Sequence, residues 1–343
     1  NWDLFCIFVE KGLKLCNENG CYCNIMPNKL LSANYADGIC NIIRNYSITK
    51  ISDYSSVRVF DVDVYPIIIA ISKQAPKPSS NITIEIMKDV NNLPIISEQR
   101  TFKLSKLYDL ENVLWASILE NEESIELSNY IYSKSIKLGN VDELTIKGAA
   151  SVNEAYEIKK IVQELKPNDK NFKKFINTGT VDPYTSLWEA KLTTYIKNRY
   201  NKPIVQNNKL KKLFPKRFVE SNLPKIIIAG MTKGIEAFYD ENKEYLAGKS
   251  TTIIHSEKYN LKNITALLNS KIIKFLAQKH KGISLAGGYL RIGPPLIKEL
   301  SIPSNLLIEN KSQDVLSKLV DKLQSVKNNP SFHDKNSKII EIE

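Results

Sequence analysis

The segment GCYCNIMPNKLLSANYADGICNIIRN, residues 20–45, constrains the fold more than any other part of the chain. Its apolar strand, CYCNIM, ends just before Pro27, and the pattern that follows predicts an amphipathic helix from Leu31 to Asn45. A helix capped by Asp3 is predicted before it, and two strands, SITKISDY and VYPIIIAIS, after it. This order is typical of the second half of a doubly wound α/β sheet, although the segment lies near residue 1.

Composition shifts predict the domain organisation. The segment KQAPKPSSN, residues 73–81, has the Pro and Ser content of a linker. We therefore expect a partial sheet domain at residues 1–75 and a linker with a helical connection at 76–140. A mixed α+β domain is predicted at 141–305, and a C-terminal helix and tail at 306–343.

Charge is distributed unevenly along the chain. Of the formal net charge of +11, none lies in the first 75 residues, where basic and acidic side chains are equal in number. Residues 191–225 carry ten Lys and Arg residues and one acid, Glu220, interleaved with aromatic residues. Because cations that neutralise phosphates release counterions, this run favours a polyanionic partner. The alternative is a solvated basic face that binds nothing.

Cysteine usage and hydropathy indicate a soluble protein in a reducing, cytoplasmic setting. All five cysteines fall in the first 40 residues without a paired Cys-x-x-Cys, so buried thiols are expected rather than a metal site. No apolar run approaches the roughly 18 residues that a membrane span needs. We expect no membrane partner and no metal.

Several blocks together resemble the back end of a known enzyme family. DLFCIFVEKGLKLCNENGCYCNIMPNKLLSANY, VFDVDVYPIIIAISK, IKGAASVNEAYEI, FINTGTVDPYTSLW, IIIAGMTKGIEAF and LLNSKIIKFLAQKHKGISLAGGYLRIGPPLIKELSIP occur in that family's order. The chain resembles the C-terminal part of a TaqI-like, gamma-class adenine-specific DNA methyltransferase of a type II restriction-modification system. The resemblance implies half of a methyltransferase-type, Rossmann-like sheet followed by a mixed α+β target-recognition domain and a C-terminal helix.

The same resemblance implies DNA sequence recognition within an adenine-specific methyltransferase or a fused restriction-modification enzyme. Such an enzyme transfers a methyl group from S-adenosylmethionine to a flipped adenine in double-stranded DNA. The family's catalytic Asn-Pro-Pro-Tyr and its cofactor-binding glycine loop would precede residue 1, and neither occurs here. We therefore expect this chain to be inactive alone and its partners to include the missing N-terminal half, with a fused nuclease domain as a further possibility.

Site residues follow from the resemblance and from the charge run. The resemblance places Phe60 where the family stacks an aromatic ring on the extruded base, and Phe8 where the cofactor's adenine lies. Core packing is the alternative for both. The other candidates are phosphate contacts (Lys197, Arg199, Lys211, Lys212, Lys216, Arg217) and base-reading residues (Ser151, Asn153, Glu154). Helix capping is the alternative for Ser151 and Asn153.

Two other functions stay open on the sequence. The first is a stand-alone specificity subunit of a restriction complex, which would need a closed, self-sufficient sheet near residue 1. The second is a metal-dependent nuclease built on Asp169, Glu189 and Lys191. In the nuclease arrangement these residues lie on a strand, whereas SLWEAKLTTYIKNRY, residues 186–200, predicts a helix.

Overall fold

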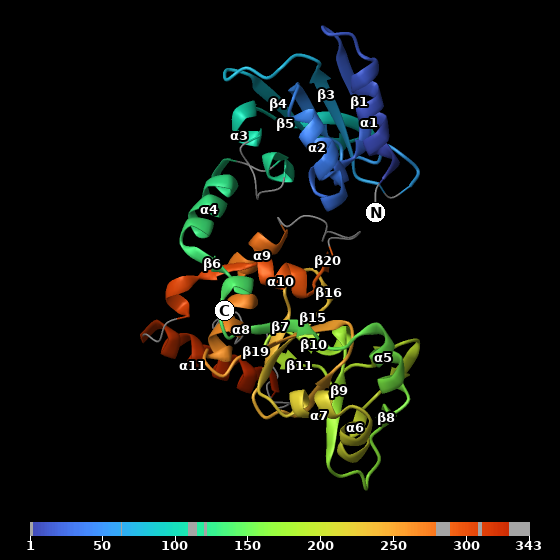
Figure 1. Ribbon diagram of the computed structural model, residues 1–343, viewed down its shortest axis with the longest axis vertical. Coiled ribbons are helices and arrows are strands. Elements are labelled where there is room, and N and C mark those ends of the chain that lie inside the picture. The colour runs from blue at the N-terminus through green and yellow to red at the C-terminus, as the bar shows by residue number, and fades with distance from the viewer. Residues whose placement is uncertain are drawn as a thin grey trace. The chain divides into compact units, whose positions relative to one another are not determined.

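The computed structural model describes residues 3–62, 64–108, 115–119, 122–278, 289–307 and 311–328. The chain divides into two compact units, with the boundary near residue 130. Each unit has its own sheets and core, and each is described by itself (Figure 1).

The first unit is built on a five-stranded sheet of order β1-β3-β2-β4-β5. Its strands are β1 (Cys21–Pro27), β2 (Ser47–Asp53), β3 (Pro66–Ser72), β4 (Asn81–Val90) and β5 (Leu93–Lys103). Only the β2–β4 pair is parallel, and β3 runs antiparallel to both of its neighbours. The alternating residues Ile67, Ile69 and Ile71 of β3 are fully buried, as expected for a strand inside a sheet.

Helices complete this unit. Helix α1 (Leu4–Leu15) buries Phe5, Val9 and Leu13, spaced four residues apart, and packs against β1 and α2 (Asp37–Ile43) (Figure 1). Gly12 permits the close approach to β1, because a Cβ atom there would lie 2.2 Å from the Tyr22 ring. The remaining elements are two 3₁₀ turns (Asn28–Leu31 and Asn34–Ala36), α3 (Leu104–Tyr108) and the 3₁₀ turn Trp115–Leu119.

The predicted helix from Leu31 to Asn45 is shorter in the structure. Two 3₁₀ turns precede α2, which begins only at Asp37. Leu30, Leu31 and Ala33, in and between these turns, are all buried. The segment therefore becomes α-helical only from Asp37.

The predicted end of the first domain at residue 75 is also wrong. Residues 73–81 are a turn within one sheet, because β4 pairs in parallel with β2 and β5 extends the sheet further. Glu85 of β4 ties the two strands together: it is buried, pairs with Lys50 at 2.8 Å and accepts a hydrogen bond from Ser52 at 2.7 Å. The helical connection expected within residues 76–140 lies partly outside the described residues, and its first described helical parts are short: α3 and the 3₁₀ turn Trp115–Leu119.

The second unit contains two four-stranded sheets, of orders β18-β9-β14-β8 and β17-β15-β19-β7. Their strands are β7 (Thr145–Gly148), β8 (Gln163–Glu164), β9 (Phe172–Ile176), β14 (Pro203–Gln206), β15 (Lys225–Ala229), β17 (Ala237–Asp240), β18 (Tyr245–Ala247) and β19 (Thr251–His255). The described part of this unit also contains four two-stranded ribbons: β6 (Ser135–Lys137) with β21 (Ser301–Pro303), β10 (Val181–Asp182) with β11 (Thr185–Ser186), β12 (Thr193–Tyr195) with β13 (Asn198–Tyr200), and β16 (Met231–Thr232) with β20 (Leu290–Arg291).

Helices of this unit are α5 (Val152–Lys159), α6 (Asn207–Leu213), α7 (Pro215–Ser221), α8 (Leu261–Leu268), α9 (Lys271–Gln278), α10 (Pro294–Glu299) and α11 (Lys311–Asn328). Helix α4 (Glu122–Ser133) leads into the unit and lies within the helical connection expected at residues 76–140. The predicted C-terminal helix is confirmed as α11, which packs on α8 (Figure 1). In the part of the chain that the structure describes, no helix is long and apolar enough to cross a membrane.

The helix predicted over residues 186–200 is wrong. The chain instead forms a turn and then the β12–β13 hairpin. The Trp188 indole donates to the Pro203 carbonyl at 2.8 Å, and the buried Thr193 and Tyr195 face the core. β-Branched and aromatic residues favour a strand once a partner strand is available, and that preference overrides the helical spacing here.

Candidate functional site

Exposed basic side chains are concentrated between residues 191 and 216 of the second unit. Helix α6 follows β14 directly and buries Leu210, so its lysines face solvent. Pro215 at the first helical position starts α7 one residue later. Seven of the ten basic side chains between residues 191 and 225 are exposed: Lys191, Lys197, Arg199, Lys209, Lys211, Lys212 and Lys216.

No carboxylate among the described residues lies within 4 Å of any of these seven side chains. Five of them were predicted as phosphate contacts, and the structure places all five on the surface. The sequence prediction left out Lys191 and Lys209, although both belong to the same charge run. We call these seven residues the cationic surface.

Arg217 contradicts its predicted role as a phosphate contact. Its side chain is only 8% exposed, and Nη2 donates to the Ala247 carbonyl at 2.8 Å. Nη1 donates to Glu220 at 3.1 Å, and Nε lies 3.5 Å from Glu154. The guanidinium is therefore part of the interior, where it joins α7 to β18 and α5.

Glu220 completes this group of charges. It also pairs with Lys147 of β7, so it bridges two basic side chains. Burial alone would raise the pKa of Glu220, but Lys147 and Arg217 outweigh burial, and the pKa is lowered from 4.5. The ionised carboxylate therefore contributes stability in the folded state.

Glu220→Gln is expected to lower the free energy of unfolding at pH 7 by about 1 kcal/mol. A lowered folded-state pKa means that this contribution is complete above the unfolded value of 4.5 and is lost as the pH falls through the folded value. Urea unfolding of both proteins at several pH values checks this. A difference between them that stays constant from pH 7 down to pH 3 would contradict it.

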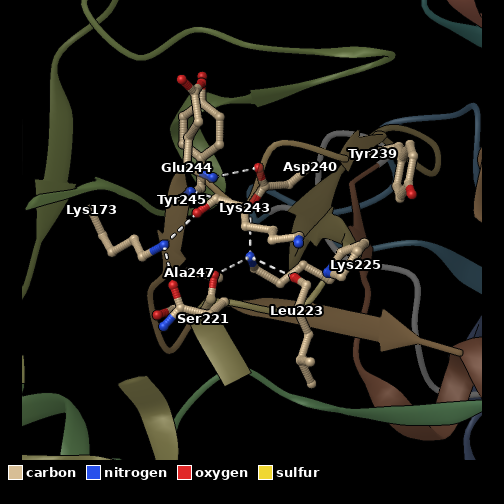
Figure 2. Close-up of polar contacts among 12 residues, drawn as sticks. Lys173, Ser221, Leu223, Lys225, Tyr239, Asp240, Lys243, Glu244, Tyr245 and Ala247 are labelled. Atoms are coloured by element: carbon tan, nitrogen blue, oxygen red, sulfur yellow. Dashed lines mark hydrogen bonds and ion pairs between the residues drawn. The ribbon is translucent and has the colours of Figure 1, made fainter. Parts of the chain in front are cut away.

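A second buried ion pair lies beneath α7. Lys225 Nζ and Asp240 Oδ2 are 2.6 Å apart, with side chains 4% and 1% exposed (Figure 2). Lys225 also donates to the Ser221 carbonyl at 3.2 Å, and Asp240 accepts from the backbone N–H groups of Glu244 and Tyr245. Burial lowers the pKa of Lys225, and the carboxylate of Asp240 opposes that shift.

Lys173 extends the same network to β9. Its ammonium donates to the Asn222 side chain at 2.8 Å and to the Lys243 carbonyl at 2.5 Å (Figure 2). Burial, and then the charge of Lys225, lower the pKa of Lys173. These contacts hold the end of α7 against both sheets, so the cationic surface rests on a rigid base.

The predicted base-reading loop is mainly a helix cap. Ser151 accepts from the Glu154 N–H at 3.3 Å, and Glu154 accepts from the Ser151 N–H at 3.3 Å, which together form a capping box at α5. The capping alternative is therefore confirmed for Ser151. Asn153 is exposed and, unlike Ser151 and Glu154, makes no capping hydrogen bond in the described structure.

Phe8 and Phe60, in the first unit, are both exposed, at 60% and 44%, so neither packs into the core that the described residues form. Phe60 lies in the loop between β2 and β3, in the wall of a hollow of about 250 Å³ lined by residues 55–60, 62, 64 and 65. Asn28 anchors this loop: its side chain donates to Ser55 Oγ at 3.2 Å, and its N–H donates to the Tyr65 carbonyl at 2.8 Å.

The cysteine prediction holds only in part. Cys40 is buried, whereas Cys21 and Cys23 on β1 are exposed. All five are free thiols, and among the described residues no three His, Cys, Asp or Glu side chains converge as metal ligands would.

The structure does not assemble the nuclease alternative. Both carboxylate oxygens of Asp169 accept hydrogen bonds, from Gln206 and from the Lys166 N–H, each at 2.8 Å. Glu189 pairs with Lys202 instead of pointing into a shared site.

Comparison with known proteins identifies the second unit. Residues 173–300 match the family described as TaqI-like C-terminal specificity domain. This part of the chain is similar to a TaqI-like specificity domain. Residues 1–60 match the Eco57I restriction-modification methylase family, so the resemblance drawn from the sequence is confirmed. No curated protein matches the chain.

One solved structure supports the fold. The structure of the type IIL restriction-modification enzyme MmeI in complex with DNA aligns with a TM-score of 0.51 and 10% identity, covering 99% of this chain and 48% of that one. The type IIG restriction endonuclease BpuSI aligns with a TM-score of 0.44 and 12% identity, covering 98% and 48%. The chain thus spans about half the length of these structures. The cationic surface lies between residues 191 and 216, within the specificity domain.

Proposed function

We propose that this chain is the DNA-recognition part of an adenine-specific DNA methyltransferase, either a separate type II modification enzyme or one fused to a nuclease, acting in the cytoplasm. The observation that carries the proposal is the cationic surface on a TaqI-like specificity domain. Cations without carboxylate partners are free to neutralise phosphates of duplex DNA. The lysines of α6 and α7 (Lys209, Lys211, Lys212 and Lys216) are the phosphate contacts, and Asn153 is a base-reading candidate.

The first unit supports the proposal that it is the end of a methyltransferase sheet. Strand β3 lies antiparallel between β1 and β2, and β1 pairs with β3 along only one of its edges within the described residues. Helix α1 exposes Leu4, Ile7, Phe8 and Leu15 beside its buried stripe. An open strand edge next to exposed apolar side chains favours completion by further strands of the same sheet. The alternative of a stand-alone specificity subunit would favour a closed edge.

Phe60 fits a role in holding the extruded adenine. Its exposed ring lies in the wall of the hollow in the β2–β3 loop, where Arg58, Val62 and Tyr65 also lie. Flipped bases are held by stacking on aromatic and apolar side chains.

S-adenosylmethionine is the methyl donor that the methylase match implies for the complete enzyme. The residues present fit it only in part. Phe8 offers an exposed aromatic face on α1, but the chain has no glycine-rich loop to bind the rest of the cofactor. We therefore propose no methyl-transfer step for this chain and expect it not to methylate alone.

Selection from a randomised duplex DNA pool at several salt concentrations tests the proposed function. We expect this chain to enrich one short sequence containing an adenine, with an affinity that falls steeply as salt rises. Salt-sensitive binding without enrichment would limit the function to non-specific DNA binding. No binding at low salt would contradict the proposal.

A further inference from the structure

The β12–β13 hairpin has an unusual turn. Thr193 pairs with Tyr200, Thr194 with Arg199 and Tyr195 with Asn198, which leaves Ile196 and Lys197 as a two-residue loop. Both have left-handed backbone angles, with φ of 42° and 68°. Such turns favour Asn and Gly, and a β-branched isoleucine in this region is strained. The surrounding structure must therefore hold the turn in place.

Contacts with other elements hold the turn in this conformation. Tyr195 is 2% exposed, lies edge-on to Phe175 at 4.7 Å and donates its hydroxyl hydrogen to the Ala155 carbonyl at 3.1 Å. Lys159 donates to the Ile196 carbonyl at 2.8 Å, and Asn177 donates to the Thr194 carbonyl at 3.0 Å. The Ile196 side chain packs on the same core. The hairpin is thus fixed to α5 and β9.

The outer face of this rigid hairpin is polar and cationic. Strand β12 alternates buried Thr193, exposed Thr194 and buried Tyr195, so Thr194 and its cross-strand partner Arg199 share the outward face. Lys197 stands exposed at the tip. Neither Lys197 nor Arg199 has a carboxylate within 4 Å in the described part of the chain, so both are available to a ligand.

A phosphate contact does not require such rigidity. A flexible lysine on a helix surface, such as Lys212 of α6, neutralises a phosphate from many positions. Reading a base edge requires a side chain held in one place, and the major groove admits a two-stranded β-ribbon. A guanidinium matches the O6 and N7 acceptors of guanine bidentately.

We infer that the β12–β13 hairpin enters the major groove and that Arg199 reads a guanine there, with Lys197 at the tip beside the neighbouring backbone. This inference rests on the proposed DNA-binding function. It moves Arg199 from the phosphate contacts, where the sequence placed it, to the specificity-determining residues.

Three variants of the chain test the assignment: Arg199→Ala, Arg199→Lys and the matched control Lys212→Ala. Each variant is used to select duplexes from a randomised pool. It is then titrated with the preferred duplex and with a scrambled duplex at several salt concentrations. We expect Arg199→Ala to lose one guanine preference and to bind the preferred duplex about tenfold to a hundredfold more weakly, with little change on the scrambled duplex. Arg199→Lys, which keeps the charge but lacks the planar guanidinium fork, should keep the same preference in a weakened form, because an ammonium also donates to guanine O6 and N7. Lys212→Ala should weaken both duplexes equally and reduce the salt slope by about 0.9.

The possible failures are distinguishable. If the unmodified chain selects a sequence and Arg199→Ala selects the same one with a shallower salt slope, Arg199 is a phosphate contact and the inference is overturned. If neither Arg199→Ala nor Arg199→Lys changes the selected sequence, a residue other than Arg199 reads the guanine, which also overturns it. If the unmodified chain selects nothing, the proposed function fails together with the inference. Thermal unfolding of each variant checks that a change in DNA binding does not come from misfolding. Because Arg199 is exposed, we expect its replacement to leave the chain folded.

Discussion

Lys225→Met is expected to lower the free energy of unfolding of the specificity domain by about 3–5 kcal/mol. The substitution keeps most of the side-chain volume but leaves Asp240 as an unpaired carboxylate that is only 1% exposed. Water cannot reach the carboxylate to replace the lost ammonium, so the folded state carries the cost of a buried, uncompensated charge. The Ser221 carbonyl also loses its Lys225 donor.

Urea unfolding followed by circular dichroism measures this effect, and two further variants interpret it. Lys216→Met removes an exposed lysine from the adjacent helix and should change stability by less than about 0.5 kcal/mol. The double variant Lys225→Met/Asp240→Asn removes both charges, keeps one acceptor for the backbone N–H groups and should recover part of the loss. If Lys225→Met matches the unmodified protein, the buried pair does not stabilise the domain.

Replacing Lys209, Lys211, Lys212 and Lys216 together by glutamine is expected to lower the affinity for duplex DNA at low salt by about two orders of magnitude. These four side chains are exposed on α6 and α7. Each phosphate contact contributes about 0.9 to the slope of log affinity against log salt, so four lost contacts should make the slope shallower by about 3–4.

A variant with the same net charge controls for long-range attraction. Lys271, Lys298, Lys318 and Lys322 are exposed on α9, α10 and α11, and their replacement by glutamine should reduce affinity far less. Fluorescence anisotropy titrations between 50 and 200 mM salt compare the two variants. Equal losses in both would mean that overall charge, and not the surface of α6 and α7, attracts the DNA.

Local patterns in the sequence predicted several features correctly. The six blocks in order were sufficient to indicate a restriction-modification methylase with a TaqI-like recognition region, which the two family matches confirm. The charge run between residues 191 and 225 predicted where the cationic surface lies. Both depend on the identity and order of neighbouring residues, and a sequence displays these directly.

The tertiary structure decided which of those residues are available to a ligand. Arg217 and Lys225 belong to the same charge run as Lys212, yet both are buried, because Ala247 and Asp240, which lie outside that run, accept their hydrogen bonds. Strand β4 joins the first sheet across an apparent linker because it pairs with β2. The hairpin that replaces the helix predicted over residues 186–200 depends on Phe175, Ala155 and Lys159. In each case the deciding partner is distant in sequence, so local propensity alone could not determine the outcome.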